Sequence, residues 1–321
     1  MNVKVKTNVR KYIVKRLLQL IPVLFGVTLL VFGLMYLAPG DPAQKKLTAG
    51  GVAVSEEVLE ETREEMGLNR PFLVQYGDWL VKALQGDLGT SFSDGLPVGA
   101  KLLNGMKYTL MLAAGSFLLA VGISIPLGIY SAVRKNRIGD YIIRLISFIG
   151  NSLPNFLISV LLMYFLCIKV KVFPIIANQS LKGLFLPALT LAIPMMSQFI
   201  RQIRAEVLEQ LRQPYVSGAR ARGVKERVIL FRNVLHNSLI PIVTILGMSV
   251  GTLMAGSVVV ETIFMWPGLG KMVMDAITAR DYPVVQGFVV WMAIIYMAVN
   301  LITDLSYHRL DPRVQEGREE S

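Results

Sequence analysis

Six long apolar runs constrain this chain more than any other feature of its sequence. A helix that crosses a membrane needs about 20 mostly apolar residues. Six segments of the 321-residue chain reach that length: 17–37, 109–131, 145–168, 184–203, 238–260 and 284–306. The first run is too long for the apolar core of a signal peptide, and the "LAPGDP" that follows it is a poor cleavage site. The sequence therefore predicts an all-α membrane protein with six transmembrane helices.

The distribution of lysine and arginine gives these spans a direction. With the N-terminus in the cytoplasm, the inside segments hold 21 of the 33 basic residues and the outside segments hold 12. Seven of those 12 lie in residues 38–108, a loop too long to follow the positive-inside rule. Without that loop the comparison is 21 to 5, so we expect both termini, including the 307–321 tail, to be cytoplasmic.

The composition excludes several other classes of protein. The net charge of +11 comes from basic residues along one membrane face, where they meet anionic lipid, and no basic patch alternates with aromatic residues. We therefore expect membrane lipid, and no nucleic acid, as a partner. Cys167 is the single cysteine, and His236 and His308 are the two histidines. This leaves no intrachain disulfide, zinc cluster or Ser-His-Asp triad, and we predict no catalytic residue and no metal site.

Residues 38–108 form the largest predicted region outside the membrane, which we call the outer subdomain. "SEEVLEETREEMGL" predicts a short helix with Ser55 as its N-cap and Gly67 at its end. "PFLVQYGDWLVKALQGD" predicts a second helix that begins near Pro71. That helix would carry one apolar face made of Phe72, Tyr76, Trp79, Leu80 and Ala83.

Prolines and polar side chains interrupt the predicted spans. The prolines in or beside them are Pro126, Pro154, Pro187, Pro194 and Pro241. Such residues are tolerated at membrane depth where neighbouring helices or a water-filled cavity satisfy the freed polar groups. Asn151, Asn155 and Gln198 are candidates to line a pathway, and hydrogen bonding between helices is the simpler alternative for each. A small-residue face that predicts close helix packing consists of Gly247, Gly251 and Ala255.

The chain carries no recognisable energy source of its own. "WPGLGKM" contains Gly270-Lys271, but Met265 stands where a phosphate loop needs its first glycine, and Met272 replaces the Ser or Thr. No span centre carries a buried acid or base for an ion relay. A stand-alone secondary transporter would need such a charge or an inverted repeat, and a membrane-embedded enzyme would need an intramembrane His or acidic pair. We therefore expect the chain to draw energy from a partner.

Residues 204–237, between the fourth and fifth spans, form a basic segment that we call the coupling segment. Its first part is helical, Pro214 interrupts the helix, and "YVSGARARGVKERVILFRNVLHNS" resumes it with Gly223 as a joint. A short helix with small and basic residues between two membrane helices suits docking into a groove of a partner protein. An amphipathic helix lying on the lipid surface is the alternative.

Several stretches, in order along nearly the whole chain, resemble permease subunits of the dipeptide/oligopeptide/nickel family of binding-protein-dependent ABC importers. The longest is "QPYVSGARARGVKERVILFRNVLHNSLIPIVTILG". The others are "LAPGDP", "ALQGDLGTSF", "SLPNFLISVLL", "VVVETIFMWPGLGKMVMDAITARDYPVVQG" and the terminal "LDPR". The resemblance implies a type I ABC importer permease fold, divided into residues 1–37 with the first span, 38–108, a five-helix core at 109–306 and the tail 307–321.

The resemblance also implies partners and a role for the coupling segment. The partners are a second homologous permease subunit, two cytoplasmic ATPase subunits and an extracytoplasmic substrate-binding protein. ATP and magnesium would be bound by the ATPases, and no cofactor by this chain. The residues that match the ATPase-coupling motif are Ala219, Arg220, Ala221, Arg222, Gly223 and Val224. The general importer signature begins Glu-Ala-Ala, whereas this chain has Ser217-Gly218-Ala219, and this departure obscures which side chains contact the ATPase.

The resemblance places the chain in a bacterial or archaeal cytoplasmic membrane as a channel-forming subunit and gives two substrate classes. Di- or oligopeptides are the favoured substrate, and a nickel chelate is the alternative, since "VQYGDWLVKAL" and "SLPNFLISVLLMYF" are similar to nickel-type members. The scarcity of histidine does not argue against nickel, because a binding protein can recognise the metal as a chelate.

Overall fold

The computed structural model describes residues 2–48 and 55–310 of the chain. These residues form helices joined by turns, and within them the only β-type pairing is an isolated bridge between Thr90 and Pro97. By their contacts the residues divide into two compact units, one made of residues 1–108 and 267–301 and the other of residues 109–266 and 302–321. These two units do not correspond to the division predicted from the sequence, which separates residues 1–37, 38–108, 109–306 and 307–321. The predicted division stays a prediction.

The first unit contains the outer subdomain and the helices around it. Its helices are α1 (Asn2–Leu37), α2 (Pro42–Thr48), α3 (Glu56–Glu65), α4 (Phe72–Leu84) and α13 (Leu269–Ala279), with the start of α5 (Val98–Val133) and most of α14 (Tyr282–Leu310). Its apolar core consists of Met35, Val98, Leu102, Leu269, Val273, Ala276, Tyr282, Val284 and Val285. Gly105 lies so close to Leu269 that a Cβ would come within 3.1 Å of the leucine side chain. The absence of a side chain at Gly105 therefore allows α5 and α13 to pack closely.

The two helices predicted in the outer subdomain are confirmed. Ser55 is the N-cap of α3, and Gly67 follows the helix with a positive φ of 68°. In α4, Tyr76 is buried, and the other residues of the predicted apolar face are partly buried: Phe72, Trp79, Leu80 and Ala83. Pro71 is the N-cap residue of α4 and stands just before the first turn. The periodicity of the sequence thus gave the correct inner face.

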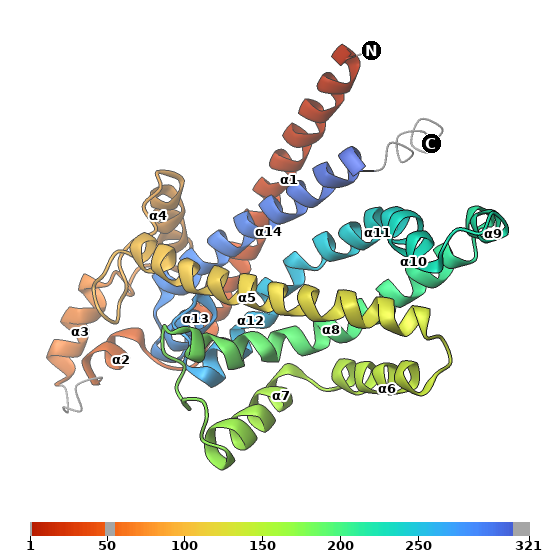
Figure 1. Ribbon diagram of the computed structural model, residues 1–321. Helices are drawn as coiled ribbons and strands as arrows, with labels where there is room; N and C mark the ends of the chain where they lie inside the picture. Colours follow the sequence, from red (N-terminus) through yellow and green to blue (C-terminus); the bar gives the residue numbers. More distant parts are fainter. Residues whose placement is uncertain (1, 49–54, 311–321) are drawn as a thin grey trace. The chain divides into compact units, whose positions relative to one another are not determined.

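The second unit contains the remaining helices and the coupling segment. Its elements are α6 (Ile138–Ser152), α7 (Asn155–Leu162), the π-helix η1 (Met163–Lys169), α8 (Leu181–Leu211), α9 (Pro214–Ala221), α10 (Glu226–Val228), the π-helix η2 (Ile229–Val234), α11 (Leu235–Met248) and α12 (Val250–Phe264). Its apolar core is built around α8, which packs against α6, α7, α11 and α12 (Figure 1). Gly128 of α5 also lies against Ile203 of α8.

The membrane spans have a less regular form than six straight helices. Val98–Val133, Leu181–Leu211 and Tyr282–Val299 are long and apolar enough to cross a membrane, and three bent helix pairs raise the number among the described residues to as many as six. The predicted third span is divided at Leu153 and Pro154, where α6 and the α7–η1 helix meet at 108°. A proline cannot continue the hydrogen bonds of a helix, and it restricts the residue before it to an extended conformation. Leu153 is accordingly extended, with ψ of 129°.

Candidate functional site

The coupling segment begins on the last turns of α8 and turns into α9. Pro214 is the first residue of α9, a position that suits proline because the first N–H of a helix has no partner within the helix. The preceding residue, Gln213, is extended, with ψ of 148°. This short helix lies beyond the end of α8 (Figure 1). The break at Pro214 that the sequence predicts is therefore a change of direction between two helices.

Gly223 ends α9 with a well-defined hydrogen-bond pattern. It has a φ of 75°, in the left-handed region that disfavours side chains with a Cβ. The N–H of Gly223 donates to the carbonyl of Arg220 at 2.9 Å, and the N–H of Val224 donates to the carbonyl of Ala219 at 3.1 Å. These two bonds form a Schellman motif, which satisfies the last carbonyls of a helix. The prediction that Gly223 acts as a joint is confirmed.

Burial divides the predicted coupling residues into two groups. Ala219 is 2% exposed and packs with Val216, which is fully buried, in the core of the second unit. Arg220, Ala221, Arg222, Gly223 and Val224 are all exposed. A Cβ placed on Gly223 would have no atom within 4 Å, so open space surrounds this position. Ala219 is thus an internal anchor of α9, and the five residues after it form the accessible tip.

An ion pair closes the turn at this tip. Arg220 Nε donates to Glu226 Oε1 at 2.6 Å, and a second bond joins Arg220 to Oε2 at 3.1 Å. The hydrogen bond from Arg220 lowers the pKa of Glu226 below its ordinary value. Both side chains are largely exposed, so the pair orders the turn while contributing little to the stability of the fold.

The structure adds two exposed apolar residues that the sequence analysis did not single out. Val228 is 43% exposed and Phe231 is 67% exposed, and they lie one turn apart just after the tip. Exposed aromatic side chains of this size are common at protein interfaces. Their spacing of three residues was visible in the sequence, but which side of η2 is exposed depends on how Ile229 and Val234 are buried.

At its other end the coupling segment is tied to α6 by a buried ion pair. Arg204 of α8 donates two hydrogen bonds to the carboxylate of Asp140, both at 2.8 Å. Asp140 is fully buried and also accepts from Ser131 Oγ and from the backbone N–H of Asn136. The carboxylate is therefore well satisfied, as a buried charge must be. The ion pair therefore joins this end of α8 to α6.

The predicted pathway residues are distributed over three helices. Asn151 is exposed at the end of α6, Asn155 is partly buried at the start of α7, and Gln198 is exposed on α8. Gly150 of α6 packs directly against Ser197 of α8, so Asn151 and Gln198 each neighbour that contact. A role in a pathway stays a prediction for all three.

The predicted small-residue face falls on two helices. Gly247 is exposed on α11, and a Cβ there would have no atom within 4 Å. Gly251 and Ala255 belong to α12, beyond the break at Ser249, and their side-chain surroundings lie outside the described residues. Their part in helix packing therefore stays a prediction.

A fully buried carboxyl group lies at the end of α12. Glu261 is 0% exposed and accepts a hydrogen bond from Thr109 Oγ1 at 2.8 Å. The apolar run in the sequence ends at residue 260, and the helix continues to Phe264. Glu261 lies in the last turn of α12. The expectation that no ion relay is present concerned acids at the centre of a span, so it does not apply to this residue.

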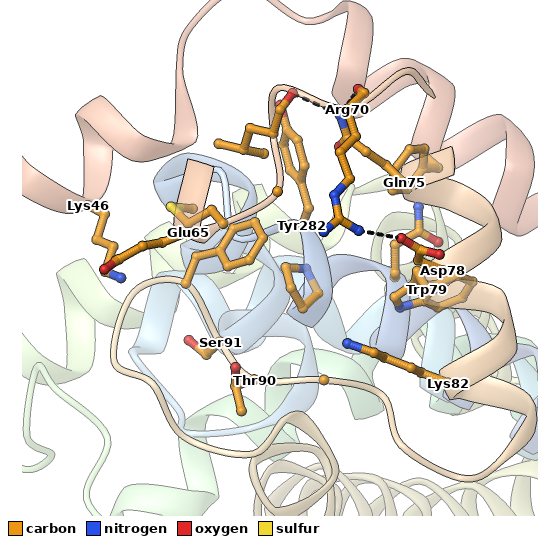
Figure 2. Close-up of a pocket in the computed structure, with 18 of the residues that line it drawn as sticks. Lys46, Glu65, Arg70, Gln75, Asp78, Trp79, Lys82, Thr90, Ser91 and Tyr282 are labelled. Carbon is orange, nitrogen blue, oxygen red and sulfur yellow. Dashed lines mark hydrogen bonds and ion pairs between the residues drawn. The ribbon is translucent and has the colours of Figure 1, made fainter. Parts of the chain in front are cut away.

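The first unit contains a cavity of about 590 Å³ whose lining is both charged and apolar. It is lined by residues of α3 and α4, by the 87–95 loop and by the start of α14, including Tyr282 and Gln286. Charged groups of both signs surround it: Arg70 and Asp78 form an ion pair at 2.8 Å, and Lys82 extends from α4 toward the middle of the cavity (Figure 2). Such a lining suits a polar or zwitterionic segment of a ligand or of another protein.

The 87–95 loop at this cavity is fixed by Asp281. This carboxylate is 1% exposed and accepts from Ser91 Oγ, from the N–H of Phe92 at 3.0 Å and from the N–H of Ser93 at 3.3 Å. On the neighbouring helices, Tyr282 OH donates to the carbonyl of Met35 at 2.9 Å, and Thr28 Oγ1 is hydrogen-bonded to Tyr76 OH. The wall of the cavity is held by buried polar contacts.

Comparison with a solved structure gives the fold. The chain is similar to the MetNI methionine ABC transporter in an inward-facing conformation, with a TM-score of 0.54 and 18% identity, over 65% of this chain and 96% of the other. At this identity the similarity concerns the fold. The fold is that of the membrane domain of a type I ABC importer.

Comparison with sequences gives the family. Residues 124–316 match the binding-protein-dependent transport system inner membrane component, and residues 9–113 match the N-terminal membrane component of the same systems. The oligopeptide transport system permease protein AppB of Bacillus subtilis (strain 168) is 40% identical, over 95% of this chain and 99% of AppB. The nickel import system permease protein NikB of Staphylococcus aureus (strain MRSA252) is 38% identical, over 94% of this chain and 91% of NikB.

The chain belongs to the family of inner membrane components of binding-protein-dependent transport systems, within the peptide/nickel group of ABC importer permeases. It is a multi-pass membrane protein and a transport subunit. The family assignment made from the sequence motifs is confirmed.

Proposed function

We propose that this chain is the channel-forming permease subunit through which an ATP-driven importer moves di- or oligopeptides across the cytoplasmic membrane. The observation that carries the proposal is the form of the coupling segment. Its tip is exposed and has open space around Gly223. Its α9 helix is anchored by Val216 and Ala219, and its first turn is bonded to α6 through Arg204. A push on the tip by an ATPase would thus reach the membrane helices through packed and charged contacts.

The proposal includes the partners and the topology. A second homologous permease subunit completes the channel, two cytoplasmic ATPase subunits bind ATP and magnesium, and an extracytoplasmic protein delivers the substrate. This chain binds no cofactor and hydrolyses no ATP. Both termini and the coupling segment are cytoplasmic, and the outer subdomain with its cavity faces the binding protein. The count of basic residues and the family membership support this arrangement.

Peptides are the proposed substrate. A nickel chelate is the second candidate, because this chain is nearly as similar in sequence to the nickel permease NikB as to the oligopeptide permease AppB. The similarity to AppB covers 99% of that oligopeptide permease, and the similarity to NikB covers 91% of that nickel permease. The mixed charges of the outer cavity in Figure 2 suit peptides, which carry an amine and a carboxylate. A nickel chelate recognised by the binding protein would use the same permease scaffold.

The test is reconstitution of the importer with the products of neighbouring genes. We expect radiolabelled peptides, delivered by the binding protein, to enter proteoliposomes and to stimulate ATP hydrolysis, while the purified permease chain alone has no ATPase activity. Uptake of nickel chelate without any response to peptides would establish the nickel alternative. For the topology, a reporter fused at Ser321 should be active only in the cytoplasm, and activity outside the membrane would contradict it.

A further inference from the structure

A second cavity, of about 550 Å³, lies between α6 and α8. It is apart from the coupling tip and is contained in the second unit. Its lining is basic and aromatic, and it consists of Tyr141, Arg144, Leu145, Phe148, Arg201 and Arg204. No carboxylate belongs to this lining.

The three arginines of this cavity differ in their partners. Arg204 is neutralised by Asp140, to which it donates both of its bonds. Arg144 and Arg201 are exposed and take part in none of the ion pairs found among the described residues. Arg144 lies over the ring of Tyr141, with Cζ 5.2 Å from the ring centroid, which orders its guanidinium. The cavity therefore presents two guanidinium groups, one from each helix, whose charge nothing in the lining compensates.

The rest of the lining is apolar and open. Leu145 is 60% exposed and Phe148 is 65% exposed, and Ile142 and Ile149 on the same helix are also about half exposed, at 51% and 49%. On α8 the apolar stretch of the span runs up to Ile200, and Arg201 is the first charged residue after it. The two free arginines thus lie at the level where a span meets water, and the apolar side chains extend from there along the helix.

We propose that this cavity binds the phosphate-bearing headgroup of an anionic phospholipid, with the acyl chains lying along Leu145 and Phe148. Guanidinium groups bind phosphate oxygens through paired, charge-assisted hydrogen bonds, and basic pockets between membrane helices on the cytoplasmic side suit anionic lipid headgroups. Free phosphate would neutralise the arginines but would leave the apolar side chains uncovered. A bound lipid would bridge α6 and α8 alongside the Asp140–Arg204 pair.

The experiment compares two double variants of the full chain, each purified within its importer complex. Arg144→Gln/Arg201→Gln removes the two free charges of the cavity. Arg134→Gln/Lys135→Gln is the matched control, since it removes two exposed positive charges from the turn that precedes α6. The complexes are placed in nanodiscs of phosphatidylcholine with a minor fraction of phosphatidylglycerol, and the lipid that stays bound after exchange into detergent is measured by native mass spectrometry.

We expect wild type and control to retain phosphatidylglycerol in preference to phosphatidylcholine. Loss of two charge-assisted contacts should lower retention by the cavity variant about tenfold or more. Equal retention of phosphatidylglycerol by the cavity variant and the control would overturn the proposal. Competition by inorganic phosphate as effective as that by the lipid would show a simple anion site instead. Dissociation of a partner subunit from the cavity variant, with lipid retention unchanged, would show that the cavity is a protein interface. The readout does not depend on transport.

Discussion

The outer subdomain and the coupling segment are attached to the rest of their own units in opposite ways. In the outer subdomain, buried polar groups fix the loop at several points, with Asp281 alone accepting three hydrogen bonds. The coupling segment has one buried ion pair at its start, apolar anchors in α9, and only an exposed ion pair at its tip. A surface fixed by many directional bonds keeps one shape, whereas a tip held from one side is able to follow a moving partner. The variants below test this difference.

The largest effect is expected for Arg204→Ala. It leaves the carboxylate of Asp140 buried without its partner, and removal of one member of a buried ion pair costs about 3–5 kcal/mol. Thermal unfolding of the purified chain in detergent should show a clear loss of stability. Arg212→Ala, an exposed arginine at the end of α8, is the control and should be neutral. Equal stability of the two variants would contradict the role of the pair.

Asp281→Ala should have the next largest effect, confined to the outer subdomain. The hydroxyl of Ser91 and the N–H groups of Phe92 and Ser93 lose their acceptor, at about 1–3 kcal/mol for a buried unsatisfied group. We expect faster proteolysis in residues 87–95 with little change in the coupling segment. Asp275→Ala removes an exposed carboxylate of α13 and serves as the control. Unchanged proteolysis of the loop would show that Asp281 does not hold it.

Two substitutions of Gly223 distinguish the effect of its backbone conformation from the effect of a side chain in the open space around it. Gly223→Val forces a β-branched residue into the left-handed region, at about 1–2 kcal/mol, while Asn tolerates that region better. Both add a side chain where the isolated chain has open space. If an ATPase approaches closely here, both variants should insert normally but lose coupled transport. If only the backbone conformation matters, Gly223→Asn should transport as wild type does. Wild-type transport by Gly223→Val would show that the segment is a lipid-surface helix.

Glu226→Gln should have the smallest effect. An exposed ion pair contributes about 0–1 kcal/mol. Because Arg220 lowers the pKa of Glu226, the contribution is present above the ordinary pKa of a glutamate and is lost as the pH falls through the lowered value. Hydrogen exchange of residues 220–226 should therefore increase in acid for wild type and be independent of pH, after correction for intrinsic rates, for the variant. Identical pH dependence in both would contradict the role of the pair.

Local signals in the sequence predicted much of the fold. The cap at Ser55, the inner face of α4 and the turn at Gly223 each depend on residues within one or two helical turns, and each is confirmed. The spans were recognisable because length and hydropathy decide them. The short helices α2 and α13 were missed, since seven and eleven residues give little periodicity.

The features that sequence reasoning missed depend on contacts distant in the chain. Asp140 and Arg204 are 64 residues apart, and neither looks unusual beside the other charges near the spans. Pro154 was visible as a break, but its 108° angle depends on how α6 and α7 pack against α8. The burial of Ala219 likewise results from packing with Val216 and the core of the unit, so its position in a motif did not reveal its role as an anchor.

The bond between Ser91 and Asp281 also has a consequence for synthesis. The two residues are 190 positions apart, and at ribosomal rates of about 5–20 residues per second the aspartate is made roughly 10–40 s after the serine. During that interval the hydroxyl of Ser91 and the N–H groups of Phe92 and Ser93 lack the carboxylate that accepts from them in the folded chain. The outer subdomain is therefore completed late, once the residues just before α14 have been translated. In a nascent chain that stops before residue 281, the 87–95 loop lacks the hydrogen bonds to Asp281.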